Sequence, residues 1–322
     1  MIPIIQEQIS GSNQISRIAL QIRYHSDACF ESRGGTPDSM NILIVTPARN
    51  EAKNLPLLLD SIIRQTSLPP VTWVIVDDGS TDETVKISKK FSAPFKILVL
   101  ELEQKGKLIS GAAFSAWWYG IDSSIKTESE FTHVMKLDAD VSLDCAYFAE
   151  LFADKDSIEA DIIGGVIAGF SREQSSYVPG PVKLYSSRAI ELLRQLPVAT
   201  GFDVMDEVFC RKQGLIIRVV KSAKFTMNRE IGHSQGLLHG RYRNGLVCKW
   251  VGYAPEYFAL HCIRYLFRRP LIFGSFFMFY GFVSANKGPY PLQLRIAHRA
   301  LQRERLRKIL RQPIKALKEL YF

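Results

Sequence analysis

The chain has 322 residues, of which 47% are hydrophobic and 23% charged, and its formal net charge is +9. This length and apolar fraction suffice for a substantial core, and they exclude a chain that is disordered or of low complexity throughout. Five cysteines without paired spacing favour a reducing compartment and argue against a zinc site. The composition therefore predicts one catalytic domain with an appendage.

Residues 1–39 differ from the rest because they are polar and aperiodic and end in a Gly, Pro and Ser segment. They lack the apolar centre of a secretory signal peptide. We interpret them as a disordered leader or a mis-assigned start, since Met40 directly precedes the first strand-like run.

Strand-like and helix-like patterns alternate after Met40. The sequence predicts strands over residues 41–45, 72–76 and 96–100, with an amphipathic helix over 55–63. A second helix is predicted over 84–91, opened by a capping box that spans Ser80 to Glu83. This alternation is typical of a parallel sheet with right-handed crossovers.

Two of the predicted strands end in carboxylates. Asp77 and Asp78 follow Val74–Val76, while Asp138 and Asp140 follow the apolar run 134–137. Ligands of open parallel sheets bind beyond the carboxyl ends of the strands, so these carboxylates are expected around one crevice. Such a concentration of negative charge predicts a metal ion or a polyol ligand there.

Four motifs in this order resemble glycosyltransferase family 2, whose members use nucleotide sugars. They are Pro47-Ala-Arg49-Asn50-Glu51, Asp77-Asp78-Gly-Ser-Thr-Asp82, Asp138-Ala-Asp140 and Gly201-Phe-Asp203-Val-Met-Asp206-Glu207. The resemblance implies a GT-A fold over residues 40–236: an α/β, Rossmann-like, mixed and mainly parallel sheet flanked by helices. Within the family, the chain is most similar to membrane-associated enzymes of exopolysaccharide and lipopolysaccharide synthesis.

The resemblance also implies a set of site residues. Asp140 is the candidate ligand of Mg²⁺ or Mn²⁺, and Asp138 is expected to face the ribose or the sugar and to reach the metal as well. Asp206 is the expected catalytic base, with Glu207 as the alternative, and the transfer would invert the anomeric centre. The donor-binding candidates are Pro47, Arg49, Asn50, Glu51, Asp77, Asp78, Lys107, Asp138 and Arg229.

The chain departs from the family pattern near Arg229. Relatives carry a histidine just before this arginine, whereas here Met227 and Asn228 precede it, which leaves His233 as a candidate substitute for the third metal contact. Plainer interpretations stay open elsewhere: Asp78-Gly79-Ser80 as a turn, Asp206-Glu207 as acids that complement a helix dipole, and Lys105-Gly-Lys107 as a solvated loop.

The positive charge is concentrated in the predicted C-terminal appendage, residues 237–322. From Lys287 to Phe322 the chain has ten Lys or Arg against two Glu, and residues 271–285 upstream carry no charge. Because about 20 apolar residues are needed to span a bilayer, this run predicts a re-entrant or interfacial helix on an anionic membrane. A buried helix or an oligomer interface is the alternative.

The function that these observations predict is sugar transfer to a lipid-linked acceptor, a polyprenyl-diphosphate saccharide, at the cytoplasmic face of a membrane. The alternatives are a polyprenyl-phosphate sugar synthase and a catalytically silent scaffold of the same fold. A nucleotidyltransferase is disfavoured because no glycine-rich pyrophosphorylase loop precedes the first helix, and a dehydrogenase because no G-x-G-x-x-G follows the first strand. Nucleic acid is a poor explanation of the basic tail, which lacks any recognition motif.

Overall fold

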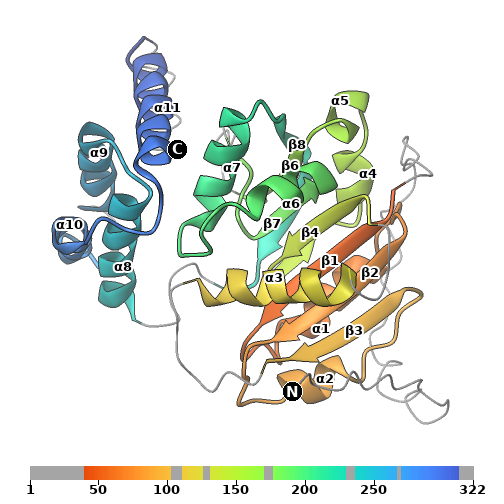
Figure 1. Cartoon of the computed structure of the whole chain (residues 1–322). Helices are drawn as coiled ribbons and strands as arrows, with labels where there is room; N and C mark the ends of the chain where they lie inside the picture. The colour runs from red at the N-terminus through yellow and green to blue at the C-terminus, as the bar shows by residue number, and fades with distance from the viewer. Residues whose placement is uncertain are drawn as a thin grey trace. The chain divides into compact units, whose positions relative to one another are not determined.

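The computed structural model describes residues 40–102, 111–125, 131–169, 177–229, 236–266 and 270–311. Within them, one 8-stranded sheet has the order β3-β2-β1-β4-β7-β6-β8-β5 (Figure 1). The strands are β1 Ile42–Ala48, β2 Val71–Asp77, β3 Lys96–Glu101, β4 His133–Leu137, β5 Val141–Leu143, β6 Ile162–Ile167, β7 Val182–Ser186 and β8 Ile217–Met227. The helices are α1 Leu55–Ile63, α2 Thr84–Ser88, α3 Ala112–Ile125, α4 Tyr147–Leu151, α5 Lys155–Ile158, α6 Ser187–Leu193, α7 Phe202–Lys212, α8 Leu237–Trp250, α9 Pro255–Leu266, α10 Phe273–Ser284 and α11 Leu292–Arg311.

The sheet is mixed and mainly parallel, as predicted. β1 pairs in parallel with both β2 and β4, and β2 with β3, whereas β7 is antiparallel to β4 and β6. The chain reverses its direction of travel across the sheet between β1 and β4. Ligands of open α/β sheets bind at such a switch point, beyond the carboxyl ends of the strands, and the predicted acids follow β2 and β4 there.

Helices cover both faces of the sheet, and the strands are apolar on both sides for that reason. Ile42 and Ile44 of β1 pack with α1 and α4 on one face. Leu43 and Val45 point the other way and pack with α3, α6 and α7. α3 crosses β1 and β2 on this second face (Figure 1). The position of α7 on this face decides which of its acids reach the crevice.

The structure confirms the predicted strands up to residue 101 and the helix over 55–63, but the second helix is shorter than predicted and its predicted capping box is wrong. α2 begins after Glu83, whose side chain makes no capping hydrogen bond, and the helix ends at Ser88 instead of Phe91. Asp82 accepts hydrogen bonds from the backbone N–H and the hydroxyl of Thr84. The Ser80 hydroxyl donates to the Asp77 carboxylate in the turn before the helix, so it does not cap α2.

The C-terminal helices pack against the beginning of α7. The Tyr290 hydroxyl donates to the carbonyl oxygen of Ala199 (2.9 Å), and a Cβ on Gly201 would lie 2.6 Å from Val251. Gly201 has φ = 89°, a backbone conformation that favours glycine. Among the described residues no helix is long and apolar enough to cross a membrane. The predicted apolar run 271–285 forms α10, a helix of 12 residues.

Candidate active site

The turn after β2 uses one of its two acids for structure. Asp77 is 4% exposed, and its carboxylate accepts the backbone N–H of Gly79 (3.1 Å) and of Ser80 (3.0 Å). Asp78 is more accessible and lies 3.9 Å from the Arg49 guanidinium. Burial raises the pKa of Asp78, and Arg49 only partly offsets this. The Asp77 carboxylate therefore stabilises the predicted turn over Asp78, Gly79 and Ser80, while the Asp78 side chain pairs with Arg49.

The loop after β1 connects this turn to the end of β8. Asn50 has φ = 56°, and its backbone N–H donates to the Ser80 hydroxyl (2.9 Å). Its side-chain oxygen accepts the backbone N–H of Thr81 (2.8 Å). The next residue, Glu51, accepts a hydrogen bond from the guanidinium of Arg229 (2.7 Å). Asn50 thus fixes the loop, and the pair of Glu51 with Arg229 connects this loop to the end of β8.

The carboxylates after β4 lie beside a buried lysine. Lys136 is 3% exposed, and its ammonium donates to the Asp138 carboxylate and to the carbonyl oxygen of Gly180 (3.1 Å). Burial raises the pKa of Asp138, Lys136 opposes this, and the charges of Asp140 and Asp203 add to it. Asp138 therefore lies within electrostatic reach of two other carboxylates, Asp140 in the same turn and Asp203 at the start of α7.

The described residues contain no group of three or more His, Cys, Asp and Glu that could hold a metal ion. Mg²⁺ usually takes only one or two protein carboxylates and completes its shell with phosphate oxygens and water, so Asp140, with Asp138 beside it, fits such an ion. Asn228 occupies the position of the absent histidine: its backbone N–H donates to the carbonyl of Asp140 (2.7 Å), and its amide contacts Ser142. His233 and Lys107 lie outside the described residues.

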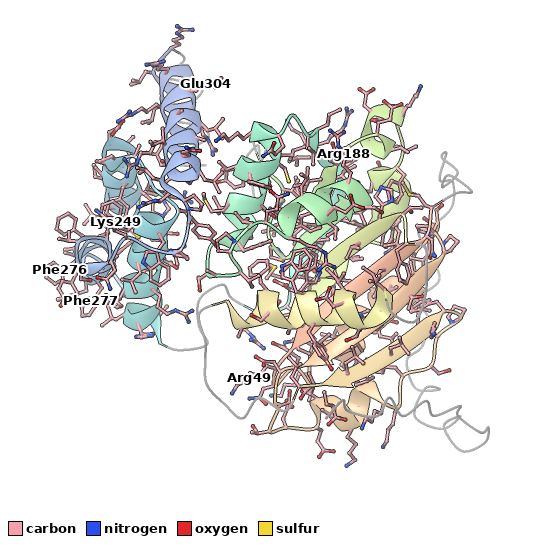
Figure 2. The ribbon with its side chains drawn as sticks, in the orientation of Figure 1. Arg49, Arg188, Lys249, Phe276, Phe277 and Glu304 are labelled. Carbon is pink, nitrogen blue, oxygen red and sulfur yellow. The ribbon has the colours of Figure 1, made fainter. Side chains whose placement is uncertain are left out.

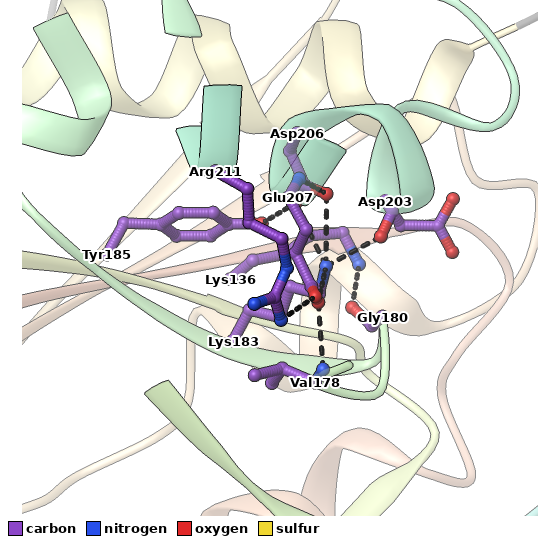
Figure 3. Close-up of polar contacts among 9 residues, drawn as sticks. All are labelled: Lys136, Val178, Gly180, Lys183, Tyr185, Asp203, Asp206, Glu207 and Arg211. Carbon is purple, nitrogen blue, oxygen red and sulfur yellow. Dashed lines mark hydrogen bonds and ion pairs between the residues drawn. The ribbon is translucent and has the colours of Figure 1, made fainter. Parts of the chain in front are cut away.

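Asp206 and Glu207, the predicted base and its alternative, are buried in α7. They are 0% and 3% exposed, and each carboxylate lies 3.0 Å from the ammonium of Lys183 on β7 (Figure 3). The Tyr185 hydroxyl donates to Asp206 (2.8 Å), and the backbone N–H of Val178 donates to Glu207 (2.8 Å). Both carboxylates are therefore paired within the protein and shielded from solvent in this structure, whereas a base must be within reach of the proton that it removes.

The buried charges are held by a matched lysine. Lys183 is 0% exposed, and burial alone would lower its pKa, but Asp206, Glu207 and Asp203 together raise it above the ordinary value. Lys183 is therefore charged when folded. Its direct partner across the antiparallel pair is Lys136, so one lysine serves Asp138 and the other serves α7.

Asp203 is the acid of α7 that is partly exposed and lies near Asp138. It lies one turn before Asp206, and Lys183 holds its carbonyl oxygen at 2.6 Å. A Cβ on Gly180 would lie 2.6 Å from the Asp203 carboxylate, so only glycine leaves room for it there. With the residues that the structure describes, this carboxylate makes no hydrogen bond or ion pair (Figure 3). One helical turn, about 5.4 Å, separates the accessible acid from the buried ones.

The family model described as "Glycosyl transferase family 2" matches residues 43–206, about half of the chain. The chain belongs to glycosyltransferase family 2. The matched segment begins in β1 and ends in α7, so it includes all the described carboxylates of the crevice. The resemblance inferred from the four motifs is confirmed.

Curated relatives of this family 2 member match only in part. The 4,4'-diaponeurosporenoate glycosyltransferase of Staphylococcus aureus strain bovine RF122 / ET3-1 is 30% identical over 122 residues, which are 37% of this chain and 26% of the relative. The protein of the same name from strain USA300 is 31% identical over 121 residues, with the same coverage. The chain thus spans about a quarter of the length of these relatives.

Solved structures with similar folds include S. aureus TarS, with a TM-score of 0.47 and 18% identity over 72% of this chain and 44% of TarS. They also include the mannosyltransferase PcManGT from Pyrobaculum calidifontis in complex with GDP-Man and Mn²⁺. Its TM-score is 0.46, with 16% identity over 91% of this chain and 88% of that chain.

A signal for the buried network of this family 2 chain was present in the sequence. Lys136 and Lys183 each interrupt an otherwise apolar strand, in Val-Met-Lys-Leu and Val-Lys-Leu-Tyr. A lysine is almost never buried unless it is paired, so each of them required a carboxylate partner in the core. The sequence does not indicate which acids are the partners of these two lysines.

Proposed function

We propose that this chain transfers a sugar from a nucleotide-sugar donor to an acceptor hydroxyl, with a divalent cation and with inversion of the anomeric centre. One observation carries the proposal: Asp138 after β4 lies beside Asp140 and within electrostatic reach of Asp203 at the start of α7, and Gly180 contacts both the Asp203 carboxylate and the lysine that holds Asp138. A donor group and a base group thus share one crevice at the switch point of the sheet.

The donor side is assigned to residues around the ends of β1, β2 and β8. Asp78 and Arg49 are placed to contact the nucleoside, and Arg229 is placed to approach the diphosphate from its position on Glu51. Asp140, with Asp138, would hold Mg²⁺ or Mn²⁺. When bound, the cation would neutralise charge on the departing diphosphate. Lys136 holds Asp138 in position and adds a positive charge beside it.

Asp203 replaces Asp206 as the proposed base. Its carboxylate would accept the proton of the acceptor hydroxyl while the acceptor oxygen forms a bond to the anomeric carbon. The bond from that carbon to the diphosphate oxygen breaks, and the nucleoside diphosphate leaves with the electron pair. A single displacement of this kind inverts the anomeric centre.

The acceptor is proposed to be lipid-linked, most simply a polyprenyl-diphosphate saccharide at the cytoplasmic face of a membrane. The support is the charge of the C-terminal region, because the cytoplasmic leaflet is anionic and attracts basic segments. Asp203 lies beside the C-terminal helices, which contact the start of α7 through Tyr290.

The donor site is tested by thermal unfolding of the purified chain with UDP, GDP, TDP or CMP, with and without Mn²⁺. A ligand at about one hundred times its Kd should add about 2.7 kcal/mol. We expect one nucleotide to stabilise the chain in a metal-dependent way and Asp140→Asn to abolish this shift. If no nucleotide stabilises the wild-type chain, the proposed donor site is wrong.

A matched variant separates donor binding from chemistry. Asp203→Asn should keep the metal-dependent stabilisation that Asp140→Asn loses, because Asp203 is assigned to the acceptor. The same variant should lose release of nucleoside diphosphate from the matching nucleotide sugar. Asp203→Asn with normal turnover would contradict its assignment as the base.

A further inference from the structure

The helix α10 exposes its large aromatic side chains. Phe276, which is 64% exposed, lies on the outer side of this helix (Figure 2). The spacing of three, four and seven residues places the exposed side chains on one face. We call this set the aromatic face, and it consists of Phe273, Phe276, Phe279, Tyr280 and Val283, each at least 56% exposed.

The opposite face of α10 is small and packs on α8. Gly274, Ser275 and Gly281 are buried there together with Met278. A Cβ on Gly281 would overlap the carbonyl oxygen of Tyr242, and a Cβ on Gly245 of α8 would overlap that of Met278. The two helices are therefore in backbone contact, which glycine alone permits.

This arrangement is the reverse of a water-facing helix. A surface helix in water buries its large apolar residues and exposes small or polar ones. Helices in lipid pack through Gly, Ala and Ser and leave large apolar residues toward the acyl chains. α10 follows the second pattern although it is only about 18 Å long, well short of the roughly 30 Å hydrocarbon core.

The charge around the aromatic face identifies its partner. Residues 236–311 contain fourteen Lys or Arg against Glu256 and Glu304, while the whole chain is only +9. Within the same helices, the Arg241 guanidinium lies 4.1 Å from the centroid of the Tyr265 ring of α9, and the Lys249 ammonium lies 4.9 Å from that of Phe282 of α10. Two copies of this surface would repel each other, whereas anionic headgroups complement it.

We propose that the aromatic face of α10 inserts into the headgroup region of an anionic lipid bilayer, with the helix lying in the plane of the membrane. The flanking cations then meet phosphate groups while the rings replace water with acyl chain. The contact between Tyr290 and Ala199 connects the docked helices to the start of α7, so the crevice lies beside the membrane-bound part.

The test measures binding of the full chain to vesicles by co-sedimentation. One set of vesicles contains phosphatidylcholine alone, and the other also contains about 30% phosphatidylglycerol, which provides a negative surface. Binding is expected on the anionic vesicles and should weaken as salt rises. Phe276→Ser with Phe279→Ser should weaken binding by about a hundredfold at full depth, since burial of each ring contributes on the order of 1.5 kcal/mol, or about tenfold.

The matched control is Leu57→Ser with Ile63→Ser on α1, where both side chains are also exposed, at 51% and 41%. This variant should bind vesicles like the wild type. As a direct probe, Phe276→Trp should add fluorescence that brominated lipid quenches, which shows insertion of the side chain itself.

Two outcomes would overturn the inference. The first is equal vesicle binding by the wild type and the Phe276→Ser/Phe279→Ser variant, or none by either. The second is a stable dimer in light scattering that the same variant dissociates, because the face would then cover a second copy. The inference rests on the proposed function only in that the membrane would carry the lipid-linked acceptor. The vesicles are tested without donor or acceptor, so a failure of membrane docking can be distinguished from a failure of sugar transfer.

Discussion

The region around α7 and the α8–α10 helix pair solve opposite packing problems. At α7 the chain buries charge, with Lys183 against Asp206 and Glu207, and leaves one acid, Asp203, at the crevice. At α10 it buries glycine and exposes aromatic rings. In both places the side chains available for function are the ones that the fold does not need for packing. Substitutions in one of these two regions can therefore be tested without changing the packing of the other.

The largest effect is expected from Asp203→Asn against Asp206→Asn. If Asp203 is the base, its loss should lower kcat by about 10²- to 10⁴-fold and leave stability nearly unchanged. Asp206→Asn should instead act through folding, because it removes a buried partner of Lys183. Measurement of nucleoside diphosphate release beside urea unfolding separates the two. The assignment is reversed if Asp206→Asn alone removes turnover in a chain of normal stability.

Lys183→Met should lower the free energy of unfolding by about 3–5 kcal/mol, because two buried carboxylates lose their cation. The matched variant also replaces Asp206 and Glu207 with Leu, which removes all three charges from the cluster. It should recover much of the lost stability, since a buried ion cluster and an apolar one are often of similar stability. Urea unfolding of both proteins tests this. No recovery in the triple variant would show that packing, and not charge, holds α7 on β7.

Gly281→Ala should destabilise the α8–α10 pair, because the new methyl group overlaps the carbonyl oxygen of Tyr242. Overpacking of this kind costs about 1–3 kcal/mol. Gly214→Ala is the control for the loss of a glycine, since a Cβ there meets nothing within 4 Å, although its φ of 78° adds strain. Limited proteolysis between α8 and α10 should accelerate only in Gly281→Ala. Equal cleavage of both variants would contradict backbone contact between the helices.

The sequence predicted the sheet well because alternating apolar strands and helices have distinct periods, and β1, α1, β2 and β4 lie where those periods place them. It located the acids of the expected crevice because Asp77 and Asp138 follow β2 and β4, the two strands that flank β1. It did not distinguish Asp203 from Asp206, because residues three apart on a helix share one face, and only the position of α7 over β7 shows which turn passes the sheet edge. The pairing of Lys183 with Asp206 depends on that same tertiary contact.

The smallest expected effect is a loss of stability at low pH that arises from a histidine in the C-terminal helices. His298 of α11 is buried, its Nδ1 lies 2.7 Å from the carbonyl oxygen of Val251, and its Nε2 lies 3.1 Å from the Gln302 amide nitrogen. The Gln302 oxygen already accepts the N–H of Ala254 (2.7 Å), so its amide nitrogen faces the ring and the neutral imidazole satisfies every partner.

Burial lowers the pKa of His298, so the folded chain binds this proton less readily than the unfolded chain does. Stability is therefore full above the unfolded pKa of about 6.5 and declines as pH falls below it. We expect the free energy of unfolding to fall between pH 7.5 and 5.5, and His298→Asn should remove part of this loss. His133 on β4 also has a pKa lowered by burial and remains in the variant, so some acid sensitivity should persist. Thermal unfolding at both pH values measures the difference, and an identical pH response of the two proteins would show that the α11 contact does not titrate.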